Sequence, residues 1–140
     1  MTTHVLIVTV GGSCAPIVCA IRQYNPDLVQ FVCSSGPRGS RRLVDGPGDV
    51  CGDNRRCPRC HEPFGDPAGQ SIVAQTGLPA ERYSIFEITE PDDMLSCLTE
   101  VTHAFDAALA RGGTVTITAD YTGGTKTMSA ALACAATGRY

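Results

Sequence analysis

The chain has 140 residues, enough for one domain with its own hydrophobic core and too few for two. Its formal net charge of −3 argues against binding of long nucleic acids, because proteins that bind them normally present a basic face. The N-terminus lacks the charged segment of a secretory signal, and the apolar run 5–10 is too short to cross a membrane. We therefore expect a cytoplasmic domain without membrane contact, in which the eight cysteines are reduced.

The first part of the chain predicts two strands separated by a helix. The β-branched run 5–10 is typical of a strand that is buried on both faces, and a Gly-Gly-Ser turn ends it. A helix is predicted at 15–24, since Pro16 is tolerated in a first turn, and a second strand at 28–33.

The next segment, 36–69, differs in kind. Gly, Pro and Arg dominate it, and its few apolar residues show no period. We predict a Cys-rich inserted loop here, followed by a short helix at about 71–76.

The last part predicts two more strands, at 83–88 and 114–119, and two more helices, at 92–111 and 126–137. Strands that alternate with helices of this length indicate parallel pairing. The predicted fold is therefore α/β and Rossmann-like, with a doubly wound, mainly parallel sheet.

The most informative stretch is Asp-Tyr-Thr-Gly-Gly-Thr-Lys-Thr at 120–127, between a predicted strand and a small-residue helix. Unpaired backbone N–H groups and the positive end of a helix dipole coincide there, and Lys126 adds a full charge. Such a corner attracts phosphate, although a plain structural turn is the alternative. It is not a Walker A loop, because Asp120 and Thr125 stand where that motif has glycine.

A second glycine turn, at 11–13, follows the first strand. In a sheet of order 3-2-1-4 the first and fourth strands flank the switch point, where ligands bind at the carboxyl ends. We therefore expect the turns 11–13 and 121–126 to form one ligand site. An NAD enzyme is disfavoured, because Gly-x-Gly-x-x-Gly is absent and Ser34 and Ser35 follow the second strand in place of an acidic residue.

These segments resemble the CARF domain, the CRISPR-associated Rossmann fold of type III CRISPR ancillary proteins. The resemblance rests on Val-Thr-Val-Gly-Gly-Ser in the first strand, Cys-Ser-Ser after the second, and Asp-Tyr-Thr-Gly-Gly-Thr-Lys-Thr-Met-Ser-Ala-Ala-Leu from residue 120. It covers the chain outside 36–69. It implies that 1–140 is a sensor domain that binds cyclic tetra- or hexa-adenylate across the two-fold axis of a homodimer.

Carried over by position, the residues expected to meet phosphate and ribose groups are Gly12, Ser13, Thr122, Gly123, Gly124, Thr125 and Lys126. Further ligand-binding candidates are their neighbours Gly11, Cys14 and Tyr121, and Ser34 and Ser35 after the second strand. CARF domains usually precede an effector domain such as a nuclease, and the chain stops where a further strand should begin. We therefore expect it to be cut from a longer protein with a C-terminal effector domain, and an unusually small domain is the alternative.

Sensing is favoured over catalysis, and a ring nuclease is the alternative. Cleavage needs an aligned 2′-hydroxyl and a group that steadies developing charge, which Ser13 and Lys126 offer. However, the two turns contain no His or Glu, and Asp120 only ends the fourth strand. A cysteine hydrolase using Cys14 is disfavoured for want of a sequence-adjacent His. A small redox or nucleotide-binding Rossmann protein would instead bind mononucleotides or dinucleotides.

The insertion also predicts a structural zinc site. In the Cys-Pro-x-Cys pattern of Cys57 and Cys60, two thiolates hold one tetrahedral metal. Cys51 is the expected third ligand, and His61 or Cys33 the fourth. Reduced, unliganded thiols are the alternative.

Two further sets of residues have plainer interpretations. The other cysteines lie in apolar segments, where a thiol acts as a small buried hydrophobe: Cys14, Cys19, Cys33, Cys97 and Cys134. The arginines of the insertion are expected in a solvated loop, with contact to a polyanion as the alternative: Arg38, Arg41, Arg42, Arg55, Arg56 and Arg59.

Overall fold

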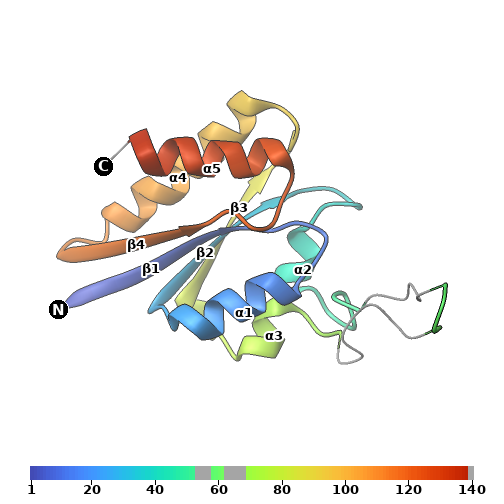
Figure 1. Cartoon of the computed structure of the whole chain (residues 1–140). Coiled ribbons are helices and arrows are strands. Elements are labelled where there is room, and N and C mark those ends of the chain that lie inside the picture. Colours follow the sequence, from blue (N-terminus) through green and yellow to red (C-terminus); the bar gives the residue numbers. More distant parts are fainter. Residues whose placement is uncertain (53–57, 62–68, 139–140) are drawn as a thin grey trace.

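The computed structural model describes residues 1–52, 58–61 and 69–138. Four strands form one parallel sheet in the order β3-β2-β1-β4 (Figure 1). They are β1 (Thr2–Thr9), β2 (Leu28–Ser34), β3 (Tyr83–Ile88) and β4 (Thr114–Asp120). The predicted α/β, doubly wound fold and its 3-2-1-4 strand order are confirmed.

Helices cover both faces of the sheet (Figure 1). On one face lie α1 (Ala15–Tyr24), α2 (Arg41–Asp45) and α3 (Ile72–Thr76), and on the other α4 (Met94–Leu109) and α5 (Lys126–Gly138). A single 3-10 turn, η1 (Ala80–Arg82), precedes β3. β1 and β2 are buried along most of their length because they contribute side chains to both cores, as the continuous apolar runs predicted.

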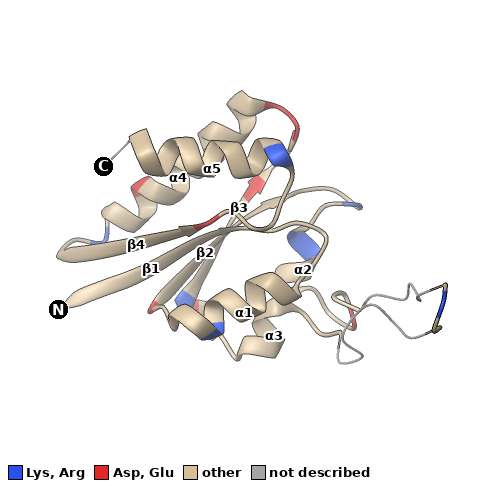
Figure 2. Ribbon diagram, in the orientation of Figure 1, with Lys and Arg blue, Asp and Glu red and all other residues tan. Residues whose placement is uncertain are grey.

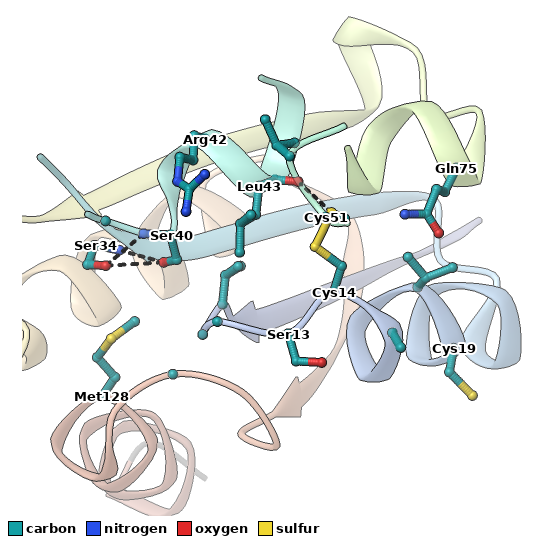
Figure 3. Close-up of a pocket in the computed structure, with 18 of the residues that line it drawn as sticks. Ser13, Cys14, Cys19, Ser34, Ser40, Arg42, Leu43, Cys51, Gln75 and Met128 are labelled. Atoms are coloured by element: carbon teal, nitrogen blue, oxygen red, sulfur yellow. Dashed lines mark hydrogen bonds between the residues drawn. A yellow bond between two sulfur atoms is a disulfide. The ribbon is translucent and has the colours of Figure 1, made fainter. Parts of the chain in front are cut away.

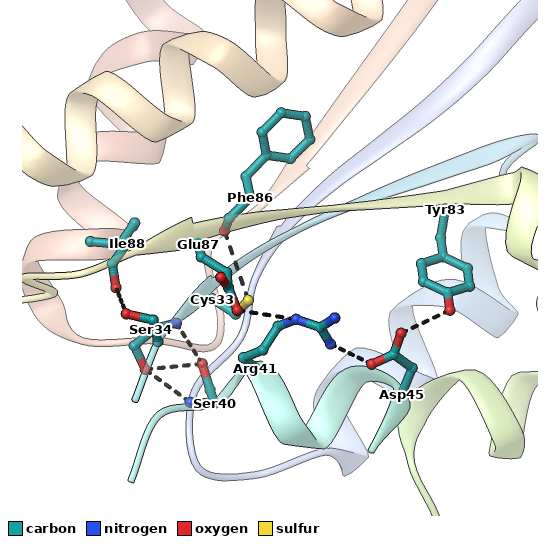
Figure 4. Close-up of polar contacts among 10 residues, drawn as sticks. Cys33, Ser34, Ser40, Arg41, Asp45, Tyr83, Phe86, Glu87 and Ile88 are labelled. Carbon is teal, nitrogen blue, oxygen red and sulfur yellow. Dashed lines mark hydrogen bonds and ion pairs between the residues drawn. The ribbon is translucent and has the colours of Figure 1, made fainter. Parts of the chain in front are cut away.

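One helix inside the insertion, α2, was not predicted. Only Leu43 and Val44 of its five residues are buried, so the segment shows no helical period. Polar contacts fix it instead (Figure 4). Arg41 pairs with Asp45 in its own helix and, at 3.1 Å, with Glu87 of β3, and the Tyr83 hydroxyl donates to Asp45 at 2.9 Å. The start of the insertion is therefore packed on the sheet rather than a solvated loop.

The loop between β2 and α2 is held by a reciprocal pair of hydrogen bonds. The amide of Ser34 donates to Ser40 Oγ at 3.0 Å, and the amide of Ser40 donates to Ser34 Oγ at 2.9 Å (Figure 4). A Cβ on Gly39 would lie 2.3 Å from the carbonyl oxygen of Ser34, so only glycine fits this close turn. The loop backbone is thus tied to the end of β2.

The expectation of fully reduced cysteines is wrong for one pair. Cys14 and Cys51, 37 positions apart, form a disulfide. Cys33 and Cys97 are buried as expected, but Cys19 and Cys134 are exposed free thiols, because they lie on the outward faces of α1 and α5. No helix in the described part of the chain is long and apolar enough to cross a membrane.

Candidate functional site

The two glycine turns predicted to form one site pack against each other. They follow β1 and β4, which pair in register up to Val8 and Asp120. At the end of β1, Thr9 Oγ1 donates to the carbonyl oxygen of Gly123 at 2.6 Å. The backbones of Gly11 and Gly124 then approach so closely that a Cβ on Gly11 would lie 2.5 Å from the Gly124 nitrogen. Both turns therefore belong to one structural unit at the carboxyl edge of the sheet.

We expect Gly11→Ala to lower the free energy of unfolding by about 1–3 kcal/mol, because the added methyl group would push the two turns apart. Gly12→Ala is the matched control, since nothing lies within 4 Å of the Cβ that it would add. Urea denaturation followed by circular dichroism measures both. Equal stability of the two variants would contradict the backbone contact between the turns.

The second turn is built to begin a helix. Thr125 caps α5, its Oγ1 accepting from the Met128 amide at 3.1 Å and donating to the carbonyl oxygen of Pro91 at 2.7 Å. Asp120 Oδ1 accepts from the Thr122 amide at 2.9 Å, and Ser129 Oγ donates to the carbonyl oxygen of Gly123 at 3.1 Å. The side chains of Thr125, Ser129 and Asp120 are thus used in hydrogen bonds within the protein. A ligand at this turn would therefore contact mainly backbone atoms.

An open cavity of about 1230 Å³ lies beside the two turns (Figure 3). This volume exceeds what a drug-sized molecule usually fills. Seven of the twelve predicted ligand-binding residues line it: Gly11, Gly12, Ser13, Cys14, Ser34, Gly124 and Thr125. The structure thus brings together the turn after β1, the end of β2 and the turn before α5.

The other five predicted residues, Ser35, Tyr121, Thr122, Gly123 and Lys126, do not line this cavity. Ser35 Oγ donates to the carbonyl oxygen of Ile88 at 3.4 Å. Tyr121 is 61% exposed, and Lys126 is also exposed, at the first turn of α5 (Figure 2). Tyr121 and Lys126 are therefore accessible to a ligand that extends beyond the cavity.

Three arginines that were not among the predicted ligand-binding residues also line the cavity. Arg22 of α1, Arg38 before α2 and Arg42 within α2 all line it. Figure 2 shows basic positions in α2 and at the start of α5, on the side of the molecule where the two turns lie, and another in the last turn of α1, toward the other end of the sheet. The sequence did contain six arginines within 36–69, which could have suggested a basic surface. It did not show which of these arginines line the cavity.

Cys14 and Cys51 line the cavity as a disulfide (Figure 3). Cys14 is therefore not a nucleophilic thiolate in this structure, and Cys51, expected as a zinc ligand, is bonded to Cys14 instead. The bond is possible because α1 begins beside the stretch of insertion that follows α2.

The remaining zinc ligands are only partly described. Cys57 lies outside the described residues, whereas Cys60 and His61 lie within them. Cys33 is buried, and burial, with Glu87 as the next contribution, raises the pKa of its thiol to about 12. Cys33 Sγ also donates to the carbonyl oxygen of Phe86 at 3.8 Å, as a buried core thiol does. The described residues contain no group of three or more potential ligands, and zinc at Cys57 and Cys60 stays a prediction.

Comparison with protein-family models and with curated proteins finds no match for this chain. Function is therefore inferred from the geometry of the cavity and from the sequence motifs that form it.

Proposed function

We propose that this chain is a CARF-like sensor domain of type III CRISPR antiviral signalling, which binds cyclic oligoadenylate in the cytoplasm as a homodimer and regulates an effector. One observation carries the proposal. The two glycine turns of the motif pack together and line one open cavity at the carboxyl ends of β1 and β4. This is the switch point of the sheet, where α/β proteins of this topology bind ligands.

The chemistry of the cavity favours a phosphate-bearing ligand. Backbone N–H groups of the glycine turns and the start of α5 attract anions, and Ser13 adds an exposed hydroxyl. Its lining includes three arginines and, among the described residues, no Asp or Glu. A polyanion composed of nucleotides fits this balance of charge.

The same lining favours binding over catalysis. It contains no His, Asp or Glu in the described part of the chain, so no general acid or base faces the ligand. Asp120, the nearest carboxylate in the motif, accepts a hydrogen bond from its own turn. A ring nuclease would have to depend on alignment of the 2′-hydroxyl and on charge stabilisation alone.

The homodimer follows from the openness of the site and the symmetry of the ligand. A ring with an even number of identical nucleotides has two-fold symmetry, so two copies of one patch read it with the same contacts. Each protomer would contribute its turns to half of the ring, and bound phosphates would offset the repulsion between the two Lys126 side chains.

We expect cyclic tetra-adenylate or cyclic hexa-adenylate to bind at one ring per two chains. Isothermal calorimetry gives the stoichiometry, and light scattering with and without the ring gives the mass of the complex. One ring per monomer, or dissociation of the dimer on binding, would contradict the shared site. Linear products after incubation would identify the ring nuclease, and preference for mononucleotides or dinucleotides would indicate a different Rossmann protein.

A further inference from the structure

The described part of the insertion that precedes residue 53 forms a wall of the cavity opposite the glycine turns. Its lining residues are 38–40, 42–43 and 50–52. Figure 3 shows Arg42, Ser40 and Leu43 on one side of the space, and Ser13 and Met128 on the other. The described part of the insertion thus supplies eight of the residues that line the cavity.

Neighbouring arginines of this wall have different roles. Arg41 is half-buried and paired with Asp45 and Glu87, which fixes α2 to β3. Arg38 and Arg42 are exposed, and neither guanidinium has an ion pair or a hydrogen bond with another described residue. Their positive charges are thus not neutralised from within the described structure.

The backbone that carries these two arginines is held at several points. Ser40, which lies between them in the sequence, is hydrogen-bonded to Ser34, and Leu43, directly after Arg42, is buried. The disulfide ties Cys51, farther along the wall, to Cys14 at the start of α1. Anchored backbone lowers the entropic cost of presenting a charged side chain to a ligand.

We propose that residues 38–52 of the insertion form the cationic wall of the ligand site, and that Arg38 and Arg42 bind phosphate groups of a nucleotide polyanion. The proposal deepens the proposed function and rests on it for the identity of the ring. The glycine turns bind one part of the phosphate backbone and the two guanidinium groups bind another. Arginine suits this role because its planar fork donates two parallel hydrogen bonds to one phosphate.

The test compares Arg38→Ala/Arg42→Ala with wild type and with Arg111→Ala. Arg111 is an exposed arginine just after α4, at the opposite end of the sheet, and controls for loss of a positive charge. Calorimetry with cyclic tetra-adenylate and cyclic hexa-adenylate is carried out at several salt concentrations. A parallel titration uses inorganic tripolyphosphate, a polyanion without bases.

We expect the double variant to bind the ring at least tenfold more weakly, because two charge-assisted phosphate contacts are lost. The slope of log affinity against log salt should fall by roughly 1.4, or about 0.7 for each contact to a single strand. Arg111→Ala should retain wild-type affinity and slope.

The outcomes separate this inference from the proposed function. Ring binding by wild type that the double variant retains in full would overturn the arginine wall and leave the sensor proposal standing. Binding of tripolyphosphate but of neither ring, with loss in the double variant, would support the wall and refute the sensor. Binding of neither probe by wild type would overturn both.

Discussion

Replacing Cys14 and Cys51 together by serine is expected to lower the free energy of unfolding by about 2–4 kcal/mol. The disulfide joins residues 37 positions apart, and a cross-link over a loop of that size removes much conformational entropy from the unfolded chain. Cys14 is also buried in the core on the α1 face, where a serine hydroxyl would need a hydrogen-bond partner. Urea denaturation of oxidised wild type and of the double variant measures the difference.

A matched control distinguishes the cross-link from general effects of losing sulfur. Cys19→Ser removes an exposed free thiol from the same helix and should leave stability unchanged. Wild type treated with dithiothreitol should approach the stability of the double variant. Equal stability of the oxidised and reduced proteins would show that the cross-link contributes nothing. Ring binding should be measured on reduced protein as well, since the proposed location is a reducing compartment.

Lys126→Ala is expected to weaken ring binding by a factor of ten to a hundred, because a charge-assisted phosphate contact contributes about 1.5–3 kcal/mol. Lys126 is the only lysine of the chain and lies exposed at the first turn of α5. Its charge there adds to the attraction of the helix N-terminus for anions. Calorimetry with cyclic tetra-adenylate and cyclic hexa-adenylate measures the change.

Lys126→Arg is the charge-conserving control and should recover most of the affinity, whereas the fold should be unaffected in both variants. Lys126 does not line the cavity, so the experiment also tests how far the ligand extends beyond it. Unchanged affinity in Lys126→Ala, together with loss in Arg38→Ala/Arg42→Ala, would place the phosphates on the insertion rather than at the start of α5.

The sequence by itself determined the sheet and the place where its two glycine turns meet. Local sequence patterns of a few residues encode buried parallel strands, amphipathic helices and glycine turns. The bounds of β1 to β4 were therefore predicted to within about three residues at each end. The convergence of Gly11 and Gly124 then followed from the strand order, because adjacent parallel strands end at the same edge.

Only the tertiary structure decided what the insertion does. No local pattern links Cys14 to Cys51, and spacing alone made Cys51 look like a partner of Cys57 in a zinc site. Likewise, Arg41 and Arg42 are adjacent in sequence, yet one is paired on β3 and the other lines the cavity. The insertion has no periodic pattern of apolar residues that would predict how it packs. Its packing, and therefore the pairing of these residues, is determined by contacts between residues far apart in the chain.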